Sequence, residues 1–305
     1  MNTKMVTIAI PAYKDKYLRE TIQSVLNQTY PYIEVIIVND QSPYDITSIV
    51  KSFSDSRIRY LINDENIGGE DIVAQWNKCL SYANGDFFCL LCDDDVYEPC
   101  FVEELVMLAE KYPYVDVFRA RVRVIDKNGM TDDLYPSLPE YETVYEYMWQ
   151  KLKGLRPQTI SEFMYRTSRI RDVGGYFSLP RAWASDSLSV YLFGKANGIV
   201  STNKVLTRFR QSGENISSDY HRDSLEKMRA TVMCRAKLRE LFEDCDDETI
   251  RFLLEKYEPL DYDRRVQNIL QNCPWSHFLQ IATHYDISKK QLLKAVVFRL
   301  VRMFR

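Results

Sequence analysis

The sequence predicts an α/β fold built on a doubly wound, mostly parallel sheet. Over the first hundred residues, apolar β-branched runs alternate with segments whose apolar residues recur at helical spacing. The runs are apolar along their whole length, which is typical of parallel strands covered on both faces. Right-handed crossovers between such strands place helices on both sides of the sheet.

The predicted elements follow one another as strand, helix, strand and helix. Strands are expected at Met5–Ile10, Ile33–Asp40, Arg57–Ile62 and Asp86–Cys92. Helices are expected at Tyr17–Leu26, Asp71–Ala83 and Pro99–Lys111. A further helix is predicted after the second strand, with Ser42 as its N-cap, Pro43 at its first position and Asp45 reaching back.

Beyond about residue 218 the pattern becomes helical. Helices are expected at Asp223–Glu243, Asp246–Tyr257, Tyr262–Gln271 and Ser288–Phe304. This region holds no catalytic motif. We therefore divide the chain into a domain of residues 1–217 and a helical region of residues 218–305, which we expect to pack on the first domain or to shape its acceptor side.

Composition limits the functional classes. The chain has 305 residues and a net charge of −3, which gives no general reason to expect nucleic-acid binding. It contains no apolar run of the length that a membrane-spanning helix needs, and its first residues lack a cleavage site, so we expect a cytosolic protein. Cys89 and Cys92 have CxxC spacing inside an apolar run, which favours core packing over a zinc or redox site.

Polar residues follow three of the predicted strands. The segments are Pro11–Tyr13, Asn39–Ser42 and Asp93–Asp95. Ligands of such sheets bind beyond the carboxyl ends of the strands, and crowded carboxylates suit Mg²⁺ or Mn²⁺. On the triplet alone, an acidic turn that caps the helix at Pro99 is equally consistent. Signatures of P-loop, dinucleotide-binding and serine-hydrolase sites are missing, and the three histidines lack zinc-protease spacing.

Two stretches carry a resemblance to a known family. "VTIAIPAYKDKYLRETIQSVLNQTYPYIEVIIVNDQS" resembles the opening of the family 2 glycosyltransferases of GT-A fold, and "NIGGEDIVAQWNKCLSYANGDFFCLLCDDD" continues the likeness as far as a D-x-D motif. The resemblance is strong over residues 6–95, thins towards residue 217 and is absent beyond. It implies an enzyme that uses a nucleotide sugar as donor, with Mn²⁺ or Mg²⁺ as cofactor.

The resemblance also implies roles for single residues on the donor side. Pro11, Ala12 and Tyr13 match positions that line the nucleotide pocket, and Asp40 matches a carboxylate that accepts from the base. Asp95, together with Asp93 or Asp94, matches the metal site that bridges the diphosphate. Taken singly, Tyr13 also reads as a packed aromatic and Asp40 as a turn residue.

A second landmark spans Leu179–Ser217. An acidic pair supplies the general base at this point in the family, and of that pair only Asp186 is present, after Ser185. Asp186 is therefore the expected base, although a carboxylate here also suits the first turn of a helix. Trp76 replaces the family's usual arginine, and Gln211 or Ser212 stands where a histidine is common.

These departures leave the donor phosphate contacts open, and Arg208 and Arg210 are the candidates to supply positive charge. The paired glycines Gly174 and Gly175 fit either the family's turn or a plain helix stop. We expect an inverting, metal-dependent transferase that acts on a glycan or lipid-linked saccharide. The alternative is a non-catalytic subunit that binds a sugar nucleotide or a partner protein, and a metal-dependent nucleotidyltransferase is weaker because its Gly-rich first loop is missing.

The segment of residues 288–305 is basic. It holds six Lys and Arg residues and no acidic residue. On a helical wheel, one broad face is apolar and the opposite face is mainly basic. The apolar face comprises Leu292, Leu293, Val296, Val297, Leu300, Val301 and Phe304, and the basic face Lys294, Arg299, Arg302 and Arg305. Such a helix either lies at an anionic membrane surface or docks its apolar face on the protein body.

Overall fold

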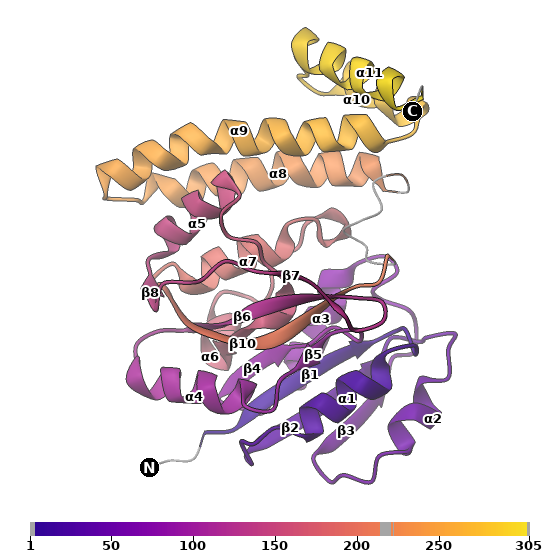
Figure 1. Ribbon diagram of the computed structural model, residues 1–305, viewed down its shortest axis with the longest axis vertical. Coiled ribbons are helices and arrows are strands. Elements are labelled where there is room, and N and C mark those ends of the chain that lie inside the picture. Colours follow the sequence, from indigo (N-terminus) through magenta and orange to yellow (C-terminus); the bar gives the residue numbers. More distant parts are fainter. Residues whose placement is uncertain (1–3, 214–220, 222, 304–305) are drawn as a thin grey trace.

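The computed structural model describes residues 4–213, 221 and 223–303, and its centre is a mixed sheet with helices on both faces (Figure 1). The strand order is β3-β2-β1-β4-β9-β6-β10-β5, with β7 beside β6 and β8 beside β10. The first four strands are parallel: β1 (Val6–Ala12), β2 (Ile33–Asn39), β3 (Ile58–Ile62) and β4 (Phe87–Leu90). This half of the sheet is the predicted one.

The second half of the sheet is mixed. Its strands are β5 (Val96–Tyr97), β6 (Val117–Asp126), β7 (Thr131–Leu134), β8 (Tyr141–Glu142), β9 (Phe163–Arg166) and β10 (Ile199–Gln211). β9 runs antiparallel to both β4 and β6, so it joins the two halves, while β6 and β10 are parallel to each other. The predicted α/β class is confirmed.

Helices cover the two faces of the sheet because strand residues alternate between them. Ile8 and Ile10 of β1 point to one core and Ala9 to the other. The first face carries α1 (Leu18–Leu26), α2 (Ile46–Lys51) and α4 (Phe101–Lys111). The second carries α3 (Ile72–Ser81), α5 (Val144–Lys153), α6 (Thr167–Asp172) and α7 (Ser185–Gly194). Cys89 is buried in the first core, and burial raises the pKa of its thiol, as expected of a packing residue.

The predicted start of α2 is wrong. The helix begins at Ile46, and its N-cap is Asp45, whose side chain accepts from the Ser48 amide at 3.0 Å. Ser42 lies outside the helix because its hydroxyl donates to the carbonyl oxygen of Tyr13, at the end of β1. The residue predicted as a cap therefore ties β1 to the loop that follows β2.

The C-terminal region forms α8 (Ser224–Glu243), α9 (Glu248–Asn272), α10 (Trp275–His284) and α11 (Lys289–Met303). We predicted two helices where α9 runs unbroken through Pro259, because packing along α5 and α8 outweighs the backbone hydrogen bond that proline removes. α10 was not predicted. The proposed domain boundary at residues 217/218 lies outside the described residues. Within the described ranges, even the two longest helices, α8 and α9, are too polar to cross a bilayer.

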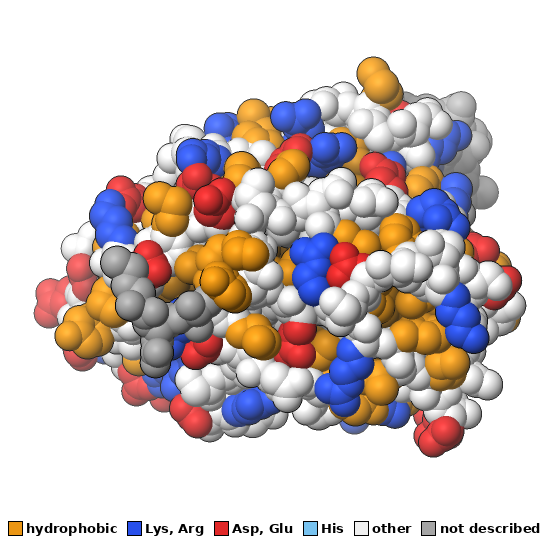
Figure 2. Space-filling view, turned by 90° about the horizontal axis from the view of Figure 1, so that it is seen from below, with side chains coloured by type: hydrophobic (Ala, Val, Ile, Leu, Met, Phe, Trp, Pro, Cys, Tyr) orange, Lys and Arg blue, Asp and Glu red, His pale blue; other side chains and the backbone are white. Residues whose placement is uncertain are grey.

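The surface carries both signs of charge. On the face drawn in Figure 2, Lys and Arg side chains are interspersed with Asp and Glu side chains. This pattern agrees with the small net charge of −3. Ligands of such sheets bind at the ends of the strands, where the sheet brings distant segments together.

The paired glycines Gly174 and Gly175 adopt a left-handed backbone conformation just after α6. Gly174 and Gly175 have φ of 86° and 92°. A Cβ at Gly174 would meet open space, whereas one at Gly175 would clash with Oδ1 of Asn77, which accepts from the Tyr176 amide. We expect Gly174→Ala to lower the free energy of unfolding by about 1 kcal/mol, the cost of the left-handed backbone alone. Gly175→Ala should cost at least about 1 kcal/mol more, measured by urea denaturation. Equal losses in the two variants would contradict the clash.

Candidate active site

The carboxyl ends of β1 and β4 are joined by the side chain of Asp93. Its Oδ2 accepts from the backbone amides of Tyr13 at 2.8 Å and of Lys14 at 2.7 Å. Burial raises the pKa of Asp93 to about 6, against the two amide hydrogen bonds that lower it. The sheet therefore brings the first and last of the predicted strand-end segments into direct contact.

Asp40, at the end of β2, holds the loop that follows β3. Its Oδ1 accepts from Nδ2 of Asn63 at 2.7 Å and from the Ile67 amide at 2.9 Å. Its Oδ2 accepts from the Gly68 amide at 2.7 Å. The carboxylate is buried. Asp40 thus shapes the predicted nucleotide pocket by fixing residues 67 and 68.

Two exposed tyrosines stand beside this pocket. Tyr13 is 39% exposed and Tyr44 is 51% exposed. Their ring centroids lie 6.4 Å apart in an edge-to-face arrangement. Tyr44 follows β2 in a turn, and no motif in the sequence pointed to it. Exposed aromatic faces of this kind are suited to stacking against a planar base.

Asp95 has a different environment from Asp93. It is fully buried, its Oδ2 accepts from the Ser161 hydroxyl at 2.6 Å, and its Oδ1 accepts from the Arg210 amide at 2.9 Å. Burial and the neighbouring Asp94 raise the pKa of Asp95 well above its ordinary value. The Thr21 hydroxyl binds the carbonyl oxygens of Asp93 and Asp95, so α1 also holds the triplet.

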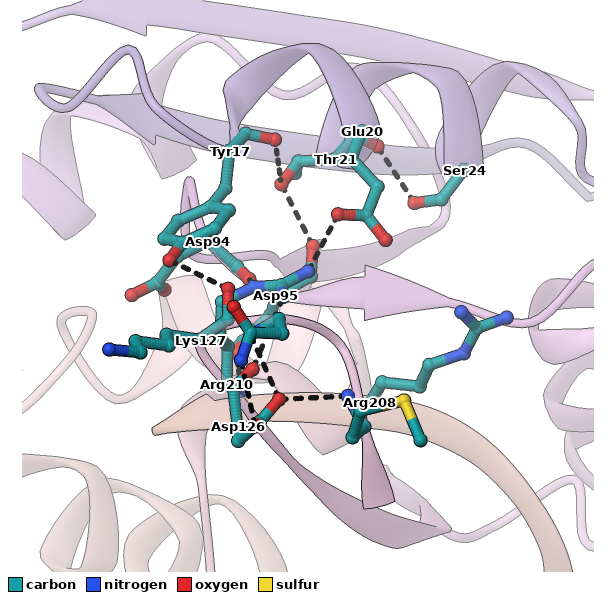
Figure 3. A network of polar contacts seen from close by, with 12 residues as sticks. Tyr17, Glu20, Thr21, Ser24, Asp94, Asp95, Asp126, Lys127, Arg208 and Arg210 are labelled. Atoms are coloured by element: carbon teal, nitrogen blue, oxygen red, sulfur yellow. Dashed lines mark hydrogen bonds and ion pairs between the residues drawn. The ribbon is translucent and has the colours of Figure 1, made fainter. Parts of the chain in front are cut away.

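The side chain of Arg210 supports the triplet from β10 (Figure 3). Its Nε donates to the carbonyl oxygen of Asp94 at 2.9 Å and its Nη2 to Glu20 at 2.6 Å. The guanidinium carbon lies 4.2 Å from the ring centroid of Tyr17. Arg208, the other predicted cation, is paired with Glu98 at 2.7 Å. Both arginines therefore have structural partners within the protein.

Asp186 lies in the first turn of α7. The loop before it contains three residues other than glycine with positive φ, namely Arg181 (55°), Ala182 (53°) and Ala184 (70°). Oδ2 of Asp186 accepts from Nε2 of Gln158 at 2.9 Å. Such backbone conformations cost energy and persist only where the surroundings impose them. The local structure thus holds the predicted base in a defined place.

One short segment contacts both predicted carboxylates. Ser161 donates to Oδ2 of Asp95 at 2.6 Å, and Gln158, three residues earlier, donates to Oδ2 of Asp186 at 2.9 Å. The chain position of this segment, just before β9, gave no sign of this role. Burial raises the pKa of the Tyr135 phenol, and the charges of Glu162, Asp95 and Asp186 add to the increase. Burial also lowers the pKa of the Lys151 amine on α5 to about 8, and the charge of Asp186 opposes that change.

A divalent cation would have few protein ligands here. The described residues contain no cluster of three or more His, Cys, Asp or Glu side chains suited to a metal. Both oxygens of Asp95 accept hydrogen bonds, whereas Asp93 is bonded through Oδ2 alone within the described ranges. Mg²⁺ commonly takes one or two carboxylates and completes its shell with substrate phosphates. The residues fit a cation that binds together with a diphosphate, with Asp93 as the accessible carboxylate.

The replacement of the family's usual arginine by Trp76 has a structural explanation. Trp76 is buried, and its ring packs on Tyr176 at 5.7 Å. Asn77 binds the backbone of Tyr176 on both sides, accepting from its amide at 2.8 Å and donating to its carbonyl at 3.2 Å. The tryptophan and asparagine pair therefore locks α3 to the turn after α6. Residues 214–217, the end of the second landmark, lie outside the described residues.

Comparisons with known proteins decide the family. The model of "Glycosyl transferase family 2" matches residues 7–173, more than half of the chain. The chain belongs to glycosyltransferase family 2. An uncharacterized glycosyltransferase of Haemophilus influenzae is 29% identical over 232 residues, which cover 74% of this chain and 71% of the relative. The putative glycosyltransferase EpsE of Bacillus subtilis is also 29% identical, over 58% of this chain and 62% of EpsE.

Solved structures of glycosyltransferases have the same fold. TarS of S. aureus, residues 1–349 in complex with UDP-GlcNAc, matches with a TM-score of 0.69 at 16% identity, over 99% of this chain and 92% of that TarS 1–349 chain. The mannosyltransferase PcManGT of Pyrobaculum calidifontis, in complex with GDP-Man and Mn²⁺, matches with a TM-score of 0.59 at 14% identity, over 98% and 88% of the two chains. The predicted GT-A fold with a C-terminal helical region is confirmed.

Proposed function

We propose that this family 2 enzyme is an inverting, metal-dependent transferase. It moves a sugar from a nucleoside-diphosphate sugar, with UDP as the expected carrier, to a hydroxyl of a glycan or lipid-linked saccharide during polysaccharide biosynthesis in the cytosol. The observation that carries the proposal is that one short segment binds both carboxylates, because Gln158 donates to Asp186 and Ser161 donates to Asp95. The donors bound by TarS and PcManGT support it.

On the donor side, each residue has a proposed task. The end of β1, Pro11 to Tyr13, lines the nucleotide pocket, and the ring of Tyr13 stacks on the base. Within the described residues, the Asp40 carboxylate accepts three hydrogen bonds. A carboxylate has about four lone pairs that can accept, so one remains for a donor group of the base. Arg210 acts on the donor indirectly, because its guanidinium fixes the main chain at Asp94.

On the acceptor side, Asp186 is the general base. Its carboxylate takes the proton of the acceptor hydroxyl while that oxygen attacks the anomeric carbon. The bond from this carbon to the diphosphate oxygen breaks, and its electron pair leaves with the nucleoside diphosphate. Because attack and departure occur on opposite faces, the anomeric configuration inverts.

Asp93, with Asp94 beside it, would hold a Mn²⁺ or Mg²⁺ ion against the diphosphate. Such an ion, when bound, stabilises the negative charge of the leaving diphosphate as a Lewis acid. Asp95 is proposed as a further ligand, because within the described residues each of its oxygens accepts one hydrogen bond and so keeps a second lone pair. In the resting arrangement, Asp95 holds β10 and the segment around Ser161 against the triplet.

We also propose that the C-terminal helices attach the enzyme to the inner face of an anionic membrane. The broad apolar face that the sequence predicts for α11 is partly packed against the protein and partly exposed. Leu292, Ala295 and Val296 pack against α9 and α10, whereas Leu293 and Val297 are 66% and 50% exposed. Leu300 and Val301 continue the exposed stripe.

The charges on α11 also divide into two sets. Arg299, expected on the solvated face, lies 4.0 Å from the ring centroid of Trp275 and donates to the Leu270 carbonyl at 2.7 Å. Lys289, Lys290 and Lys294 are exposed beside the apolar stripe. Apolar side chains flanked by lysines suit insertion among anionic head groups, where each basic residue contributes roughly 1 kcal/mol. Phe304 and Arg305, also part of the prediction, lie outside the described residues.

The first prediction for this function concerns the base. Asp186→Asn should lower kcat by at least about 10²-fold while donor affinity, measured by calorimetry, stays within about twofold. Asp132→Asn on β7 is the control, because this carboxylate is exposed. Full turnover in Asp186→Asn would refute the assignment, and loss in Asp132→Asn alone would move the base to β7.

The cation is tested without turnover. UDP should bind at least about tenfold more tightly in Mn²⁺ than in EDTA, because the ion joins the carboxylates to the diphosphate. Asp93→Asn should remove this difference, because the amide has no negative charge to hold the ion. The local structure should persist, because the amide oxygen can still accept from the backbone amides of residues 13 and 14. Asp64→Asn, an exposed carboxylate after β3, should retain it. Equal UDP affinity in Mn²⁺ and EDTA for the unmodified protein would contradict the proposal.

Membrane attachment is tested by co-sedimentation with anionic and neutral vesicles. The protein should sediment with anionic vesicles, less so at high salt, and truncation after Ile287 should abolish binding. Val297→Glu should weaken binding about tenfold or more without unpacking α11, whereas Met107→Glu, an equally exposed apolar site on α4, should not. The proposal fails if the full chain stays in the supernatant at low salt, or if Val297→Glu instead dissociates a dimer.

A further inference from the structure

Asp186 lies at the end of a hydrogen-bonded chain that leads into the core. Nε2 of Gln158 donates to Oδ2 of Asp186 at 2.9 Å, and the hydroxyl of Tyr147 donates to Oε1 of Gln158 at 2.7 Å. Tyr147 belongs to α5 and is fully buried. A reversed amide would turn its carbonyl oxygen towards the carboxylate, so the two partners of Gln158 select a single orientation.

Both ends of this chain are anchored. The ring of Tyr147 packs edge-to-face on Tyr191 of α7, the helix that carries Asp186, with centroids 6.0 Å apart. Arg119 lies 5.3 Å from the centroid of the same ring and donates to the carbonyl of Pro157, the residue before Gln158, at 2.6 Å. Arg119 is itself held by Glu162 at 2.8 Å in a buried ion pair. The amide of Gln158 can therefore move little relative to α7.

We propose that Gln158 is a positioning residue for the transfer reaction: it holds Oδ2 of Asp186, so that Oδ1 receives the proton of the acceptor hydroxyl. Tyr147 supports it from behind. This inference rests on the proposed role of Asp186 as base. A carboxylate free to rotate about its last bond would present its basic lone pair to the acceptor only part of the time, and restraint of such groups is a large part of catalysis. Within the described residues, Oδ1 accepts one hydrogen bond, a long one of 3.5 Å from the Ser187 hydroxyl.

The hydrogen bond from the amide also provides a second readout, the pH dependence of the rate. A hydrogen bond donated to an ionised carboxylate favours the ionised form over the protonated form. Losing this donor should therefore move the acidic limb of the pH–rate profile towards higher pH. The titratable groups on which Asp186 acts come from several elements: Tyr135, Tyr147, Lys151, Tyr165 and Cys234. Lys151, whose pKa burial lowers to about 8, stays protonated below about pH 7, so the acidic limb is free of its titration.

The test compares Gln158→Leu with Tyr147→Phe. Gln158→Leu should lower kcat about tenfold and move the acidic limb up by about one pH unit, the effect of one hydrogen bond to a charged group. Tyr147→Phe keeps the ring in the core and removes only the hydroxyl, so its effect on both quantities should be smaller and in the same direction. Donor affinity should stay unchanged in both variants. Gln150→Leu on α5 is the control, because within the described residues its side chain makes no hydrogen bond.

The outcomes separate this inference from the proposed function. An active Asp186→Asn variant would overturn the base itself, and Gln158 would then have nothing to position. An inactive Asp186→Asn together with Gln158→Leu of unchanged kcat and unchanged acidic limb would leave the base intact and overturn the inference. A lower kcat with an unmoved limb in both Gln158→Leu and Tyr147→Phe would indicate a merely structural role and count against it as well.

Discussion

The site depends on one buried carboxylate, that of Asp95. Its two oxygens bind the Ser161 hydroxyl and the Arg210 amide, so they join three segments that enter the site from different parts of the sheet. Taking a carboxylate out of water is costly unless hydrogen bonds replace the lost hydration. The raised pKa of Asp95 reflects that cost, and its two donors offset part of it. The second aspartate of the D-x-D motif thus builds the frame, while Asp93 binds the end of β1.

The parallel half of the fold could be predicted because its signals are local. Each strand is a short apolar run, each helix has its own periodicity, and parallel strands necessarily end at one edge of the sheet. Contact between Asp93 and the end of β1 follows from that geometry. The role of Asp186 was predicted only from the family resemblance. A single carboxylate in the first turn of a helix is common, so the residue alone does not indicate a catalytic base.

The rest of the site could not be predicted, because it depends on contacts between distant residues. Ser161 is 66 residues from Asp95, and Arg210 is 115 residues away. Gln158 reaches Asp186 through a loop with no recognisable motif. Tertiary packing also overrode local rules when α9 continued through Pro259 and when half of the apolar face of α11 remained exposed.

The C-terminal helices carry no catalytic motif, yet they support the loop that leads to the base. Arg181, one of its left-handed residues, donates to the Gly69 carbonyl at 2.7 Å and pairs with Asp223, just before α8, at 3.1 Å. The ammonium of Lys227 on α8 lies 4.5 Å from the ring centroid of Trp183. Strained backbone persists only where its surroundings hold it. Because α8 and the residue before it supply two of these restraints, and because Gly69 lies in the loop that Asp40 fixes, the helical region is part of the scaffold that relates the donor pocket to the base.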